Sequence, residues 1–198
     1  LLLAALAFSP ITNAQQQEST ELVQLSYVAY YGRPADPAGL AYWADRLESE
    51  GNNLNSILDS FGNSPEYIEN FGSLTKEELV NGLFQQLFTR DSDSGGLAYY
   101  VDLLESGSRT LTSIALDIAN GAQNDDRNSL DNKLAAANAF TEYLESNSPV
   151  LTSESVRDVL STVTVDGSTV TLAINAMSTT VPIEDWVVVA GNGDGDGV

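Results

Sequence analysis

The sequence contains no cysteine and no histidine, and only two of its 198 residues, Lys76 and Lys133, are lysines. Without cysteine the chain has no disulfides, no thiolate metal sites and no thiol nucleophile. Without histidine it has no imidazole base and no Ser-His-Asp triad. The residue types that most often carry catalysis are therefore missing, and we expect a protein that is not an enzyme.

Positive charge is also scarce, because 28 Asp and Glu stand against 8 Lys and Arg and give a formal net charge of −20. Such a chain repels phosphate backbones and anionic lipids, so we expect no nucleic-acid partner. The excess of carboxylates indicates either a saline habitat or Ca²⁺ bound between carboxylates. Both interpretations place the protein outside the cytoplasm.

The first segment, residues 1–14 (LLLAALAFSPITNA), is apolar and then small or polar. This pattern is typical of a secretory signal peptide, with Thr12 and Ala14 at the −3 and −1 positions of cleavage before Gln15. The alternative is a retained apolar segment that packs on a partner. The segment is shorter than the roughly 20 apolar residues needed to cross a bilayer, so we do not expect a membrane-spanning protein.

An internal repeat organises residues 15–147, because the chain matches itself at an offset of 57 residues. The first copy contains GRPADPAGLAYWADRLESEGNNLNSI (32–57) and the second contains TRDSDSGGLAYYVDLLESGSRTLTSI (89–114). A tandem unit of this kind is one supersecondary element used twice. Apolar residues follow helical spacing in each copy, so the sequence predicts a mainly α tandem helical module.

Several helix starts are predicted from capping residues. Asp36 followed by Pro37 is an N-cap and first-turn pair, and Asp93 repeats the cap in the second copy. Thr75 and Glu78 form a predicted capping box at the start of the second copy.

The C-terminal part, residues 148–182, fits either two short helices or a hairpin turning at Asp166-Gly167. Helical spacing of its apolar residues makes helices the preferred prediction. Residues 183–198 are predicted to form an extended tail rich in Asp and Gly, after an apolar run that begins at Trp186.

The segments YYGRPADPAGLAYWADRL, TRDSDSGGLAYYVDLLESG and IANGAQNDDRNSLDNKLAAANAFTEYL resemble the bacterial domain-of-unknown-function family numbered 4214. The resemblance covers roughly residues 22–144, and the second copy departs from the pattern at Thr89, Asp91 and Tyr100. It implies a helical module of secreted and cell-surface proteins, including surface-layer proteins and calcium-dependent exported proteins, with no associated catalytic activity. The family is also distantly similar to phycobilisome linker modules.

Arg33 with Asp36, and Arg90 with Asp93, recur in both copies. They could bind a ligand, but a turn salt bridge combined with a helix N-cap is the preferred interpretation.

Two acidic stretches are candidate calcium sites, because hard oxygen ligands suit Ca²⁺. The first contains Asp91 and Asp93, and the alternative is a solvated turn. The second contains Asn192, Asp194 and Asp196, which match the start of an EF-hand loop, and the alternative is an acidic linker.

Aromatic and apolar residues supply the candidate contact surfaces. Trp43 and Tyr100 lie on the apolar stripes and are predicted core residues, whereas Tyr42 and Tyr99 point away and are candidate subunit or glycan contacts. Trp186, Val187, Val188 and Val189 could pair with a neighbouring chain by strand addition.

Together these features predict a secreted structural protein at the cell surface or in the extracellular matrix, which assembles with copies of itself into a layer or filament with Ca²⁺ as a cofactor. The alternative is an anchor module that binds cell-surface polysaccharide with the help of calcium.

Overall fold

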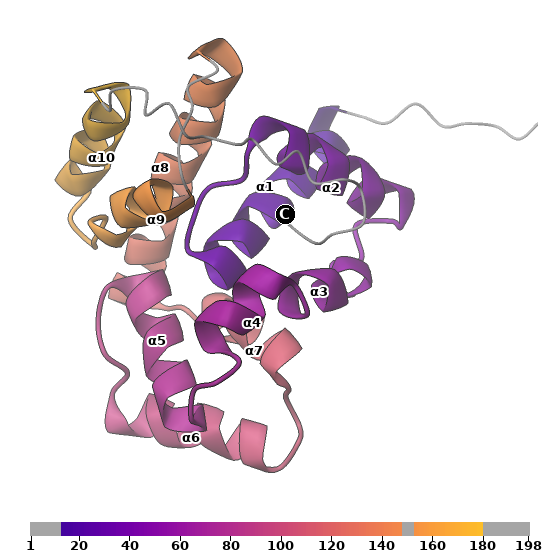
Figure 1. The fold of residues 1–198 in the computed structure, drawn as a ribbon, viewed down its shortest axis with the longest axis vertical. Coiled ribbons are helices and arrows are strands. Elements are labelled where there is room, and N and C mark those ends of the chain that lie inside the picture. Colours follow the sequence, from indigo (N-terminus) through magenta and orange to yellow (C-terminus); the bar gives the residue numbers. More distant parts are fainter. Residues whose placement is uncertain (1–12, 148–152, 180–198) are drawn as a thin grey trace, which may run out of the picture.

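The chain folds into a helical body, seen in a computed structural model that describes residues 13–147 and 153–179 (Figure 1). Every regular element in these two ranges is a helix. The helices are α1 (Asn13–Tyr31), α2 (Pro37–Ser49), α3 (Asn55–Gly62), α4 (Pro65–Phe71), α5 (Lys76–Phe88), α6 (Ser94–Glu105), α7 (Leu111–Asn120), α8 (Asn124–Asn147), α9 (Ser153–Ser161) and α10 (Ser168–Thr179). The mainly α prediction is confirmed, as is the preference for helices over a hairpin near Asp166.

Helices α1–α4 form a first unit, and α5–α7 with the start of α8 form a second unit at the predicted offset. The predicted caps set where these helices begin. The Asp36 carboxylate accepts from the Gly39 amide at 2.8 Å, and the Asp93 carboxylate accepts from the Gly95 and Gly96 amides at 2.9 Å. Thr75 and Glu78 form the capping box at the start of α5. Each cap satisfies amides that have no partner within the helix.

The first helix of each unit ends in a left-handed residue, Gly32 (φ 65°) in one and Thr89 (φ 57°) in the other. A β-branched residue is strained in this conformation, whereas glycine is not. The Thr89 hydroxyl donates to the Val163 carbonyl at 2.8 Å, in the connection between α9 and α10. The connection between α9 and α10 therefore supplies a hydrogen bond that partly offsets the backbone strain at Thr89.

The two units meet through counterpart helices, with α3 against α7 and α1 against α5. Gly62 is needed at the first contact, because a Cβ there would overlap the backbone of Thr112. The Tyr30 hydroxyl donates to the Thr112 carbonyl at 2.7 Å, and the Gln86 amide donates to the Ala29 carbonyl at 2.7 Å. Main-chain acceptors in each unit are thus bound by side chains of the other.

The C-terminal helices α9 and α10 pack on α8, beside the two units (Figure 1). Lys133 on α8 is almost fully buried and donates to the Leu160 carbonyl at 2.8 Å, near the end of α9. Asn132 donates to the Thr164 carbonyl at 2.8 Å. Parts of the predicted N-terminal segment (1–12) and the whole predicted tail (183–198) lie outside the described residues.

Candidate functional site

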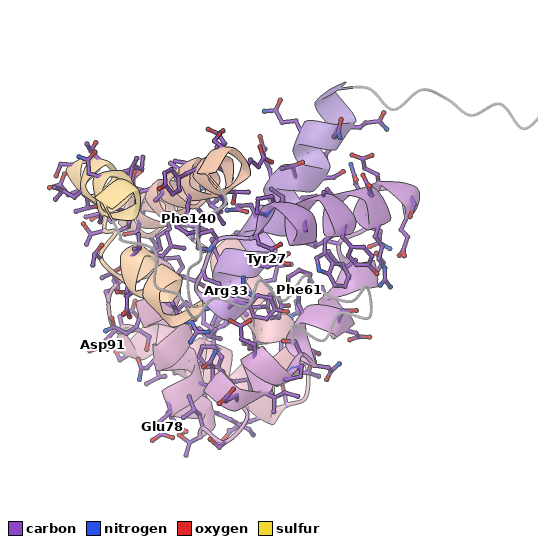
Figure 2. The ribbon with its side chains drawn as sticks, turned by 45° about the horizontal axis from the view of Figure 1, so that its top comes forward. Tyr27, Arg33, Phe61, Glu78, Asp91 and Phe140 are labelled. Atoms are coloured by element: carbon purple, nitrogen blue, oxygen red, sulfur yellow. The ribbon has the colours of Figure 1, made fainter. Side chains whose placement is uncertain are left out.

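The arginine of the first unit, Arg33, lies in a cage of two aromatic rings and one carboxylate. Its Cζ atom is 5.2 Å from the ring centroids of both Tyr27 and Tyr31, and its Nη2 atom is 2.9 Å from Glu66. Figure 2 shows Tyr27, Arg33 and Phe61 near one another in the middle of the molecule. Cation–π contacts and a two-point hydrogen bond to a carboxylate hold the guanidinium in one orientation.

Arg90 repeats this cage in the second unit. Its Cζ atom is 5.1 Å from the Phe84 centroid and 6.0 Å from the Phe88 centroid, both at the 57-residue offset from the first cage. Its carboxylate partner is Asp126, at 2.6 Å, on the helix that corresponds to α4. The predicted caps at Asp36 and Asp93 are confirmed. The predicted salt bridges within the turns are wrong, because the arginines pair with Glu66 and Asp126. Both arginines pair with a carboxylate on a distant helix, whereas Asp36 and Asp93 cap α2 and α6.

Glu66 joins the first unit to the C-terminal part of the chain. Its Oε1 atom, which accepts from the Arg33 Nε, also accepts from Arg157 of α9 at 2.7 Å, and the Arg157 Nε donates to the Tyr31 carbonyl at 3.0 Å. Burial acts to raise the pKa of Glu66, but the hydrogen bonds and charges of the two guanidinium groups outweigh burial and lower it. Glu66 is thus an anion shared by two cations.

The first candidate calcium site has both of its aspartates on the surface, and Figure 2 shows Asp91 at the edge of the molecule. An Asp91 oxygen accepts from the Gln85 amide at 2.8 Å, and one Asp93 oxygen caps α6. Hydrogen bonds from the Gly96 and Gly95 amides lower the pKa of Asp93, so it stays anionic. Within the described ranges, no three acidic side chains gather as a metal site. Calcium binding here stays a prediction, and Asn192, Asp194 and Asp196 lie outside the described residues.

The two candidate contact tyrosines are on the surface, with Tyr42 39 % and Tyr99 60 % exposed. Trp43 is buried, as predicted, whereas Tyr100 is only partly buried against the core. Each surface tyrosine meets its inward neighbour edge to face, at centroid distances of 5.1 Å and 5.0 Å. Their role as contacts stays a prediction, and Trp186, Val187, Val188 and Val189 lie outside the described residues.

Most of the positively charged side chains pair with carboxylates of the same chain. All six arginines form ion pairs with carboxylates of the same chain: Arg33, Arg46, Arg90, Arg109, Arg127 and Arg157. Lys133 is buried, and burial lowers its pKa to about 8. Lys76 is exposed at the start of α5. The surface therefore offers many carboxylates and only three exposed cations, Lys76, Arg109 and Arg127, of which both arginines are already ion-paired.

Sequence reasoning missed Glu66, Asp126, Arg157 and Lys133. The repeat could have directed attention to the partners of Arg33 and Arg90, but Glu66 and Asp126 do not correspond at an offset of 57. Lys133 could have been noticed as an isolated lysine in an alanine-rich helix.

In the part of the chain that the structure describes, no helix combines the length and the apolar character needed to cross a membrane. No curated protein and no solved structure matches the chain. A family model described as Domain of unknown function (DUF4214) matches twice, over residues 5–71 and 58–128. The first match includes α1–α4, and the second runs from within α3 to the start of α8. The matches together cover more than half of the chain, so the protein belongs to the DUF4214 family and carries its domain in tandem.

Proposed function

We propose that this chain is a secreted structural protein that assembles with copies of itself at the cell surface or in the extracellular matrix. The observation that supports this best is the internal use of its arginines. The conspicuous polar clusters, such as the two arginine cages, hold helices together. A body built in this way suits a load-bearing part better than a reaction site.

Because the arginines are paired within the chain, assembly is expected to require cations from solution. Two copies that each carry a charge of −20 repel one another. Only Lys76, Arg109 and Arg127 of their cationic residues are exposed, and both arginines already pair with carboxylates of their own chain. Divalent cations such as Ca²⁺ neutralise carboxylates on both surfaces, and Asp91 with Asp93 is the candidate site within the described residues.

Electron microscopy of the protein purified from its native source, with and without EGTA, tests this function. We expect ordered polymers that dissolve when calcium is removed and reform when it is restored. Polymers that resist EGTA would support the structural role and contradict the involvement of calcium. Monomers in both conditions would contradict assembly.

A variant pair tests the candidate calcium site. Asp91→Asn with Asp93→Asn removes two charges while asparagine keeps both the side-chain acceptor and the cap of α6. The control, Glu142→Gln with Glu145→Gln, removes two charges from exposed positions of α8. We expect the first variant to need more calcium for assembly than the control. Equal calcium dependence would show that general charge screening, and no bound ion at this site, drives assembly.

A second candidate function is a calcium-assisted anchor that binds cell-surface polysaccharide. The observation in its favour is the exposure of Tyr42 and Tyr99, since exposed aromatic rings can stack on sugar rings. A monomeric protein that co-sediments with cell-wall polysaccharide would support the anchor over the assembling protein.

A further inference from the structure

Four of the five exposed positions of α2 keep their residue type in α6, although two of its three buried positions differ. Outward-facing Ala41, Tyr42, Asp45 and Ser49 have the same four residue types at Ala98, Tyr99, Asp102 and Ser106, and all eight residues are exposed. Of the three buried residues of α2, Trp43 and Ala44 are replaced by Tyr100 and Val101, and only Leu47 is kept.

This pattern is the reverse of what packing alone would produce. Core positions constrain residue type, whereas exposed positions usually tolerate change. In α3 and α7 the changes of residue type follow burial, since exposed Asp59 corresponds to Leu116, which is buried in the core. At α2 and α6 the two units differ at buried positions and agree at exposed positions. A surface kept in this way is expected to contact another molecule.

The retained side chains define a narrow stripe along each helix. Tyr, Asp and Ser at positions i, i+3 and i+7 lie on one helical face, and we call Tyr42, Asp45 and Ser49 the α2 stripe. Tyr99, Asp102 and Ser106 form the α6 stripe. An additional acid lies beside each aspartate: Glu48, which is half-buried with one oxygen out of reach of solvent, and Glu105, which is exposed. Each stripe therefore offers an aromatic ring next to an aspartate, and the α6 stripe adds a second exposed carboxylate.

This combination is the one that the chain uses for its own cations. Arg33 and Arg90 each lie over two aromatic rings and pair with a carboxylate. Arg46 lies over Trp43, 5.3 Å from the ring centroid, and pairs with Glu50. An aromatic face beside carboxylates binds guanidinium and ammonium groups through cation–π attraction and charge-assisted hydrogen bonds.

We propose that the α2 stripe and the α6 stripe are two equivalent docking sites for a second polypeptide that carries exposed arginine or lysine side chains. Charge complementarity selects such a partner, because the chain has a net charge of −20 and its own arginines are engaged internally. A second copy of this chain supplies few such cations, because only Lys76, Arg109 and Arg127 are exposed and both arginines are ion-paired within the chain. The proposal goes beyond self-assembly, since it adds a basic partner.

The placement of the stripes makes the molecule bivalent. Figure 1 shows α2 at the upper right and α6 at the bottom, on opposite sides of the body. One chain can therefore bind two basic segments that approach from different directions, and one partner molecule that reached both stripes would gain avidity. The α6 stripe is the stronger site, because Tyr99 is more exposed than Tyr42 and neutral Leu103 stands where α2 has Arg46.

The test measures binding of a fluorescent Arg-Gly repeat peptide and a matched Lys-Gly repeat peptide by fluorescence anisotropy and calorimetry. The stripe variant combines Tyr42→Leu, Asp45→Asn, Tyr99→Leu and Asp102→Asn. The control variant, Glu142→Gln with Glu145→Gln, removes the same number of charges from another exposed face. All six changed positions are exposed, and circular dichroism verifies that both variants stay folded.

The wild-type protein is expected to bind two Arg peptides, with a preference for arginine over lysine that the tyrosine substitutions remove. The stripe variant should bind about tenfold more weakly, while the control changes affinity by less than about twofold. Equal losses in both variants would show a diffuse polyanion and overturn the proposal. Stripe-dependent binding of a neutral soluble glucan, with unchanged binding of the Arg peptide, would assign the stripes to polysaccharide and also overturn it.

Discussion

The two tandem units share a backbone plan but fill it differently. In the first unit Phe61 is fully buried among Tyr27, Tyr30, Tyr31 and Trp43, with ring centroids 5.1–5.7 Å apart. In the second unit the residue corresponding to Phe61 is Ile118, and α6 has no fully buried residue. Aromatic rings bury more area each and add specific edge-to-face contacts. The first unit is thus the more tightly packed of the two.

The arginine cage of the first unit is also more deeply buried than that of the second. The side chain of Arg33 is 17 % exposed, whereas that of Arg90 is 39 % exposed. Glu66 also accepts from Arg157 of α9, and no arginine outside the second unit pairs with Asp126 within the described residues. The ion pair has a structural role in both units. Its contribution to the free energy of unfolding depends on how deeply it is buried.

The largest expected difference between the units comes from their anchoring carboxylates. Glu66→Gln leaves two guanidinium groups without a charged partner at a buried site, and we expect a loss of about 4 kcal/mol in the free energy of unfolding. Asp126→Asn breaks a more exposed pair and should cost about 1 kcal/mol. Urea denaturation followed by circular dichroism measures both. Glu69→Gln, an exposed change on α4, is the control, and equal costs for Glu66 and Asp126 would refute the comparison.

Identical leucines in the two units offer the next test. Leu47 is fully buried, whereas its counterpart Leu104 is only partly buried. We expect Leu47→Ala to cost about 3 kcal/mol and Leu104→Ala about 1 kcal/mol, because the cost of a leucine deletion grows with burial and with the cavity left behind. Thermal unfolding of the two variants in parallel measures the difference. A Leu104→Ala variant as unstable as Leu47→Ala would show that α6 packs as tightly as α2.

The features that could be predicted from sequence are local or periodic. Asp36, Asp93 and Thr75 stand immediately before helices that they cap, so a few neighbouring residues were sufficient to identify them. The repeat offset placed each helix of the second unit from its counterpart in the first. Helical spacing of apolar residues also decided correctly between helix and hairpin at α9 and α10.

The features that could not be predicted depend on contacts between distant residues. Arg33 and Glu66 are 33 residues apart, and Arg157 and Glu66 are 91 apart, so no local pattern joins them. Nearby Asp36 was the obvious partner for Arg33, but it was already engaged as a cap. The identity of the two outward stripes was visible in the sequence, but only burial showed that these positions face solvent.

Lys133 extends the comparison to the C-terminal helices that cover the two units. Because burial lowers its pKa from 10.5 to about 8, protonating it in the folded state costs free energy. Below pH 8 the full penalty of about 3 kcal/mol applies, and it is relieved as the pH rises from 8 to 10.5. We therefore expect the wild-type protein to gain stability across this window. Lys133→Met should lack the gain, and a flat wild-type profile would show that Lys133 is solvated in solution.

The smallest expected effect concerns tyrosines of the first unit whose counterparts cannot ionise. Burial raises the pKa of Tyr31 from 10.0 to about 12, and the residue at the same place in the second unit is Phe88. A raised pKa of an acid means that its stabilising contribution is complete below the unfolded value and is lost as the pH rises through the folded value. Tyr31→Phe gives the first unit the residue that the second already has. At about pH 11 we expect the variant to lose roughly 1 kcal/mol less of its neutral-pH stability than the wild type, measured by urea denaturation at both pH values. Identical alkaline losses would show that the first unit opens locally, so that Tyr31 ionises there as it does in the unfolded chain.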